Sequence, residues 1–225
     1  MGQLNRLESL DLSDNQLTQL PLELEQLKAI RKLNLSKNKL QSLPASVLAR
    51  MPKLHELEIS HNKLFCLFDG VGDAVAVDEA FVLPSLTRLD ARNSGIENIV
   101  DTDAKISLPA VKEILLGQNN LTSLGRLLLG TPQLYMLEIR TNKFTGLPLG
   151  VLDLTELRNL DMASNRMEHM PSELGSMVDL TTFVWEGNPV RNVPRSTTTT
   201  DALMKLLRQR QELDFPTAGK KYFRI

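Results

Sequence analysis

The sequence predicts an α/β solenoid: a curved stack of short coils, with parallel strands on its concave face and short helical or 3₁₀ turns outside. Three observations lead to this fold class. Leucine makes up 43 of the 225 residues, one pattern recurs about every 23 residues, and each copy carries a polar residue, nearly always asparagine, at the same place. A fixed period of this length is typical of repeat proteins, in which each unit buries the apolar face of its neighbour.

The repeated unit reads Leu-x-x-Leu-x-Leu-x-x-Asn-x-Leu, with apolar substitutions, and occurs eight times between residues 4 and 194. Its alternating apolar residues fit a short strand with one face in the core. The asparagine side chain can bond backbone groups where each coil turns, which predicts an asparagine ladder along the stack. The ladder positions are Asn15, Asn38, Asn62, Ser94, Asn119, Asn142, Asn165 and Asn188.

The fourth ladder position and the return half of each coil carry further expectations. Ser94 is shorter than asparagine, so we expect a bulge or a register shift there, with Asn93 as its substitute. In the return halves, a proline that follows an apolar residue fixes φ and removes a backbone donor, which predicts a helical turn and no second strand. This pair occurs at Leu20-Pro21, Leu43-Pro44, Leu147-Pro148 and Met170-Pro171.

This pattern resembles the leucine-rich repeat family, in its 23-residue intracellular class, and the resemblance covers residues 4–194. It implies a protein that binds a partner protein on its concave face, as an intracellular scaffold or adaptor without enzymatic activity. Two other functions stay open at this point. One is a regulatory subunit of a phosphatase or small-GTPase pathway, and the other is a structural component of a large cytoskeletal assembly.

We divide the chain into a solenoid over residues 1–195, a capping helix over 196–213 and a tail over 214–225. The third repeat is long, and its insertion at 65–84 predicts a loop on the outer side or edge. At 97–108, an acidic run at 101–103 is expected to cap a turn that leads into 104–108. The chain starts inside a repeat, which predicts that upstream repeats are missing from it, with cover by another surface as the alternative.

The helix and the tail close the chain in different ways. The run at 196–200 offers an N-cap, and leucines at helical spacing follow it, so we expect Leu203 and Leu206 to cover the last coil. The final residues, 220–225, combine basic and apolar side chains. They are interpreted as a frayed terminus, with docking on a partner or on the capping helix as alternatives.

Composition and motifs exclude several functions. The 26 basic and 27 acidic residues nearly cancel, which argues against nucleic acid as a partner. No apolar run is long enough for a membrane span, and a single cysteine, Cys66, points to a reducing compartment. We therefore expect a cytoplasmic protein, with nuclear or cytoskeletal association as variants. His55, His61 and His169 do not converge, so no metal, cofactor, catalytic residue or small-molecule substrate is expected.

The strand residues between the consensus leucines form the outward face of the sheet, because side chains alternate along a strand. One residue of each strand lies between two consensus apolar residues, and together these eight residues form a central column across the sheet. Five of the eight are acidic. Repeats four to six combine both charges with apolar residues, as a binding hot spot with a polar rim does. The alternative is a solvated sheet face held by cross-strand ion pairs. The predicted protein-binding residues are Glu58, Arg88, Asp90, Arg92, Leu115, Tyr135, Met136, Glu138 and Arg140.

Overall fold

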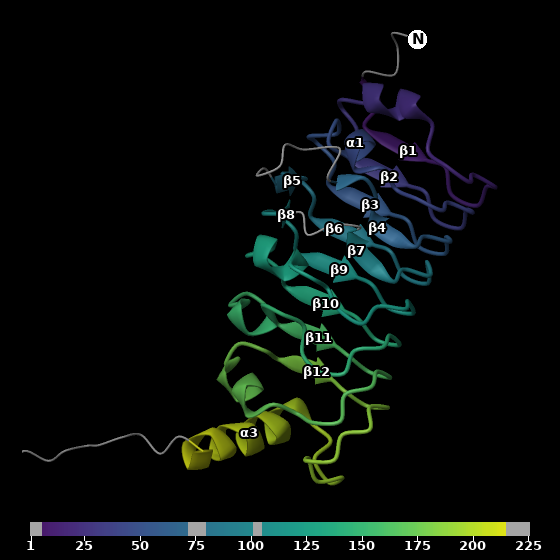
Figure 1. The fold of residues 1–225 in the computed structure, drawn as a ribbon. Coiled ribbons are helices and arrows are strands. Elements are labelled where there is room, and N and C mark those ends of the chain that lie inside the picture. The colour runs from purple at the N-terminus through teal and green to yellow at the C-terminus, as the bar shows by residue number, and fades with distance from the viewer. Residues whose placement is uncertain (1–5, 72–79, 101–104, 215–225) are drawn as a thin grey trace, which may run out of the picture.

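The computed structural model describes residues 6–71, 80–100 and 105–214. Its main feature is an eight-stranded parallel sheet with one three-residue strand from each repeat, in the order β1-β2-β3-β6-β9-β10-β11-β12 (Figure 1). The consensus leucines pair in register, as Leu33 does with Leu57. The predicted fold class is therefore confirmed. The strands are β1 (Ser9–Asp11), β2 (Lys32–Asn34), β3 (Glu56–Glu58), β6 (Arg88–Asp90), β9 (Glu113–Leu115), β10 (Met136–Glu138), β11 (Asn159–Asp161) and β12 (Thr182–Val184).

The return halves of the coils form short helical turns on the side opposite the strands. They are η2 (Leu22–Gln26), α1 (Ala45–Leu48), η3 (Leu127–Gly130), η4 (Val151–Asp153) and η5 (Ser172–Ser176). Pro21, Pro44 and Pro171 stand immediately before η2, α1 and η5 in extended backbone, as the sequence predicts. Between the two sides lies one continuous core of consensus leucines, most of them fully buried.

The asparagine ladder forms as predicted, and Asn142 shows its pattern. Its Nδ2 donates to the backbone oxygen of Leu116 in the preceding coil, at 3.0 Å, and to Ile139 in its own coil, at 3.1 Å. Its Oδ1 accepts the N–H of Leu121, at 3.0 Å. Each ladder side chain thus satisfies backbone groups that a turning coil leaves without a strand partner. Equivalent contacts occur at Asn38, Asn62, Asn119, Asn165 and Asn188.

Ser94 keeps its place in the ladder, so the expected register shift onto Asn93 is wrong. The Ser94 hydroxyl donates to the Ile59 oxygen at 2.9 Å, and the Ser94 backbone oxygen accepts the Leu64 N–H at 2.7 Å. A shorter side chain therefore suffices, because the backbone carbonyl takes over the acceptor role. Asn93 instead contacts the ring of His61. Asn93 and His61 each precede a ladder residue, and both have the left-handed backbone of the equivalent residues in the other coils. The fourth coil therefore stays in register with the third.

The insertion in the third repeat contains strands at both ends, where the sequence predicts a loop, and its middle, residues 72–79, lies outside the described residues. β4 (Cys66–Phe68) pairs with β7 (Asn98–Val100), and β5 (Ala80–Val82) pairs with β8 (Lys105–Ser107). These segments are apolar enough to enter the core, where the rings of Phe68 and Phe81 pack 5.3 Å apart. The expected turn over 104–108 is likewise a strand at 105–107. The proposed cap at 101–103 lies outside the described residues.

The last coil is covered by α3 (Thr200–Asp214), which runs beneath β12 toward the outer turns (Figure 1). The hydroxyl of Thr200 accepts the Phe183 N–H at 2.9 Å and so occupies a position on the open edge of β12. Thr199 caps the helix, since its Oγ1 accepts the Ala202 N–H. Leu203 and Leu207 are fully buried.

The burial on this helix differs in one place from the expected pair. Leu206 is only half-buried, so Leu203 and Leu207 form the buried face, with Met204 beside them. The opposite end of the stack is more open. Leu10 and Leu12 of the first coil are partly exposed, whereas their counterparts Leu33 and Leu35 are buried.

Candidate protein-binding surface

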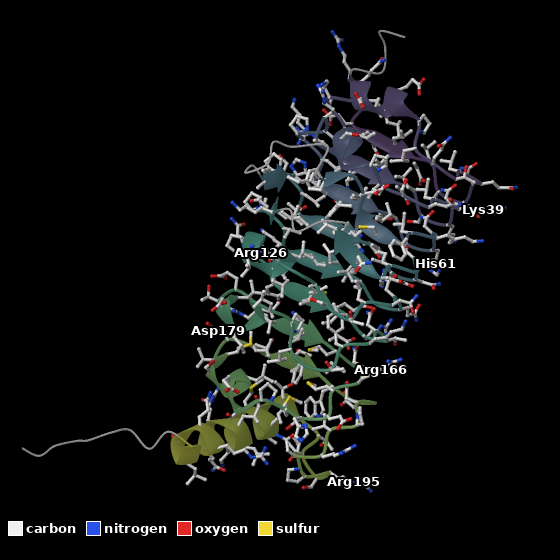
Figure 2. The ribbon with its side chains drawn as sticks, in the orientation of Figure 1. Lys39, His61, Arg126, Arg166, Asp179 and Arg195 are labelled. Carbon is white, nitrogen blue, oxygen red and sulfur yellow. The ribbon has the colours of Figure 1, made fainter. Side chains whose placement is uncertain are left out.

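Charged side chains crowd both edges of the solenoid (Figure 2). Lys39, His61 and Arg166 lie along the edge of the asparagine turns, and Arg126 and Asp179 lie along the edge of the outer turns. No group of three or more His, Cys, Asp or Glu side chains that could hold a metal ion occurs within the described residues. The sheet face lies between the two edges.

Six of the predicted residues join in one ion network across β3, β6, β9 and β10. At its centre, Asp90 is buried and accepts from Arg92, at 2.6 Å, and from Arg88, at 3.2 Å. Hydrogen bonds to Asp90 raise the pKa of Arg92 above its usual value. Three arginines thus face four carboxylates within the network. Its members are Glu58, Arg88, Asp90, Arg92, Glu113, Glu138 and Arg140.

Leu115, one of the predicted protein-binding residues, lies beneath this network and is not as accessible as the sequence predicts. Its strand β9 lies between β6 and β10, and Leu115 pairs with Asp90 on one side and Glu138 on the other. Arg92 reaches Glu138 at 3.8 Å, so this ion pair crosses above β9. Leu115 is only 6% exposed as a result. Asp90 is similarly inaccessible, so neither residue offers its side chain to a partner.

The next strands form a shallow apolar hollow of about 250 Å³ on the same face. Met136 lies at one end of it, and Thr182 and Val184 lie at the other, on β12. Asp161 contributes a carboxylate for which no ion pair occurs among the described residues. The hollow therefore combines an apolar floor with unpaired charge, beside a network whose own charges are already paired. It is lined by Met136, Leu137, Glu138, Asn159, Leu160, Asp161, Thr182 and Val184.

Residues 3–64 match the family model described as Leucine rich repeat. The chain is similar to an LRR protein of Leptospira interrogans, with 28% identity and a TM-score of 0.69 over 86% of this chain and 46% of that one. The chain is a leucine-rich repeat solenoid. A second similar structure is the functional domain of InlJ from Listeria monocytogenes, which shows the same fold at 24% identity and a TM-score of 0.59, over 84% of this chain and 37% of that one.

Two curated proteins also match this leucine-rich repeat chain. Podocan-like protein 1 of Mus musculus is 36% identical over 167 residues, and Chaoptin of Drosophila melanogaster is 34% identical over 124. These matches cover 72% and 53% of this chain, but the chain spans only 28% and 8% of the two relatives. In the described part of this solenoid, no helix is long and apolar enough to cross a membrane.

The ion network leads to a first prediction about Asp90. Replacing Asp90 with Asn should lower the free energy of unfolding by about 1–2 kcal/mol, because Arg88 and Arg92 lose a shared buried carboxylate. The loss stays small because both arginines keep partial exposure and other acidic partners. Urea denaturation followed by circular dichroism measures it. Asp161→Asn is the matched control on β11, and equal losses in the two variants would contradict a structural role for the network.

Sequence reasoning missed some residues of this solenoid's surface and misplaced another. Glu113 also belongs to the ion network, through its ion pair with Arg88. Its place among the outward-facing strand residues was the signal that the sequence offered. Asn159, Thr182 and Val184 line the hollow, but their types are too ordinary to mark a site. Tyr135 is 48% exposed, yet it lines a separate recess with Lys112, Gln133 and Glu156. The predicted pair Tyr135 and Met136 therefore belongs to two different recesses of one face.

Proposed function

We propose that this chain is a protein-binding module that takes a partner segment on the concave face, centred on the apolar hollow of β10–β12. The observation that carries the proposal is the contrast between the hollow and the ion network. The network arginines are already paired with carboxylates, so a partner gains little from them, whereas Met136 and Val184 offer apolar area. An apolar centre with polar surroundings is the usual anatomy of an interface.

Two structures with the same fold support a binding role. An LRR domain of FLRT2 takes part in an octameric complex with Latrophilin 3 and Unc5D, and resembles this chain at 20% identity and a TM-score of 0.62, over 85% of this chain and 57% of that one. The LRR ectodomain of the plant receptor kinase GASSHO1/SCHENGEN3 from Arabidopsis thaliana occurs in complex with CASPARIAN STRIP INTEGRITY FACTOR 2, at 25% identity and a TM-score of 0.53, over 81% of this chain and 24% of that one. The element that this chain shares with them is the leucine-rich repeat fold.

Within this function, we assign the chain to an intracellular scaffold or adaptor of the cytoplasm. The support is the 23-residue period and the single cysteine, Cys66, which is buried in the core. A further resemblance lies at the C-terminal end. Gly187-Asn188-Pro189, followed by Pro194-Arg195 and a leucine-rich helix, is similar to the end of leucine-rich repeat-containing protein 40. Fractionation of cells that express the tagged chain tests the compartment, and recovery in the secreted fraction would contradict it.

The binding surface is tested by a double substitution, Tyr135→Ala with Met136→Ala. It should weaken partner binding by about 1–3 kcal/mol, since truncation of a central apolar side chain at an interface has this effect. The measurement is quantitative pull-down of crosslinked partners from native extract, followed by titration of the partner that is recovered. Met136→Ala alone should give most of the loss, because Tyr135 lies outside the hollow.

A matched control separates the two faces of the molecule. Leu149→Ala truncates an apolar side chain that is 62% exposed and lines a recess to which no residue of the eight-stranded sheet contributes. It should leave partner recovery unchanged. If the double variant retains every partner at the original level while Leu149→Ala loses them, the concave face is not the binding surface. Unchanged melting of both variants shows that the comparison concerns binding and not folding.

A further inference from the structure

The outer side of the solenoid carries an exposed apolar groove of about 600 Å³ between the sixth and seventh repeats. Leu149 and Leu152, on its floor, are 62% and 40% exposed. Leu129 of the preceding coil extends the patch, because a β-carbon on Gly150 would lie only 3.0 Å from its Cδ2. Large apolar side chains that are exposed side by side mark a contact surface. We call this feature the outer groove; it is lined by residues 146–150, 152, 153, 169, 171 and 173.

The rim of the outer groove is acidic. Asp153 lies in η4 and Glu173 in η5, both side chains are exposed, and neither forms an ion pair within the described residues. The outer groove thus offers an apolar floor between two carboxylates that have no cation. The ligand chemistry that fits it is a short segment with apolar or aromatic side chains and positive charge.

The C-terminal tail of this chain, residues 215–225, has that chemistry. It contains Lys220, Lys221 and Arg224 and no acidic side chain, and its apolar residues include Tyr222 and Phe223. We propose that the tail binds in the outer groove of its own chain, with its aromatic residues on Leu149 and Leu152 and its cations facing Asp153 and Glu173.

The position of α3 makes this contact possible. Arg208 Nε donates to the Gly175 oxygen at 2.9 Å, and a β-carbon on Gly175 would meet the backbone nitrogen of Arg208 at 2.9 Å. The helix therefore packs directly on η5 at Gly175, which is two residues from Glu173 in the sequence. From Arg208 to the end of the helix at Asp214, the chain advances by about 9 Å. The 11 residues that follow can extend to about 36 Å, so the outer groove is well within reach.

Docking within one chain also has an entropic advantage over capture of a separate peptide. A short flexible connection keeps the tail at an effective concentration of about a millimolar or more near the groove. Weak contacts, such as two aromatic rings on two leucines with exposed ion pairs, are sufficient at that concentration. Ion pairs of exposed groups weaken with salt, so the contact should loosen between low and high ionic strength.

The test is site-specific photocrosslinking in the full chain, with p-benzoylphenylalanine in place of Phe223. Irradiation should link this position to residues 146–153 or 169–173, as identified by peptide mass spectrometry. Leu149→Lys should lower the yield at least five-fold, because it removes apolar floor area and adds a charge that repels the cationic tail. Val178→Lys is the matched control, because Val178 is a 74% exposed apolar residue that does not line the outer groove. The crosslinking yield of this variant should not change.

Mixed light and heavy isotope-labelled chains identify the occupant. Crosslinks within one isotopic species support the proposal, and so does a further loss of yield with Glu173→Lys. Crosslinks between light and heavy chains would mean that a second copy fills the groove, and would overturn it. Crosslinks outside the groove, no crosslinks, or a yield that Leu149→Lys leaves unchanged would also overturn it. Equal melting temperatures of the variants confirm that each is folded.

Discussion

Leu203→Asp and Leu207→Asp, made separately on α3, are each expected to lower the free energy of unfolding by about 3–5 kcal/mol. Both side chains are fully buried in the core. Each substitution removes a packed leucine and places a carboxylate without a partner at the end of the apolar stack. An open solenoid end also weakens the neighbouring coil, because stability in repeat proteins passes from unit to unit. Urea denaturation followed by circular dichroism measures the loss.

Two controls on the same helix sharpen this prediction. Leu213→Asp has the same chemical change at a position that is 79% exposed, and its effect should stay within about 0.5 kcal/mol. Leu206→Asp should fall between the two, since Leu206 is half-buried. An unchanged denaturation midpoint for Leu203→Asp would show that α3 does not stabilise the array. Equal effects at Leu203 and Leu213 would point to helix propensity as the cause instead of burial.

Asn142→Ala is expected to destabilise the solenoid by about 2–3 kcal/mol. The substitution leaves the Leu121 N–H buried without its acceptor, and an unsatisfied buried donor costs about 1–3 kcal/mol. The carbonyls of Leu116 and Ile139 lose one partner each but keep another, from Asn119 and Asn165. The small cavity left by the amide adds to the loss. Thermal and urea denaturation measure the effect.

The first ladder residue provides the matched control. Asn15 is exposed and donates only within its own coil, to the oxygens of Leu12 and Ser13. Asn15→Ala should therefore change the free energy of unfolding by about 0.5 kcal/mol or less. If Asn15→Ala and Asn142→Ala were equally destabilising, the contribution of the ladder would not come from bonds between coils.

The repeat pattern alone was sufficient for the sheet and its core. A strand residue such as Leu33 must point inward, and its neighbour Asn34 outward, once the period of two is known. Because the copies are in register, the same rule applies to every coil, and the eight strands form where the pattern places them. The proline-started turns followed from a property of one residue type. These features are local or repeated, so a sequence can encode them visibly.

Ser94 and the insertion show where the pattern stops being informative. The serine keeps the ladder because a backbone carbonyl substitutes for an amide, and no residue type indicates that exchange. Near Phe68 and Phe81, two segments without the repeat pattern become strands because they can pair with residues 98–100 and 105–107 of the next coil. Pairing across such distances depends on what the neighbouring coil leaves open, which is a property of the assembled stack.

The sequence by itself determined the period, the inward and outward columns, and the residue types on the concave face. The tertiary structure decided which of those residues a partner can touch. Leu115 and Asp90 stand in the outward column, yet Arg92 crosses above β9 to Glu138 and covers the leucine. Long charged side chains can form ion pairs with residues of several neighbouring strands, because they reach further than the distance between adjacent strands. Exposure at this face therefore depends on the combination of neighbours, which no single repeat contains.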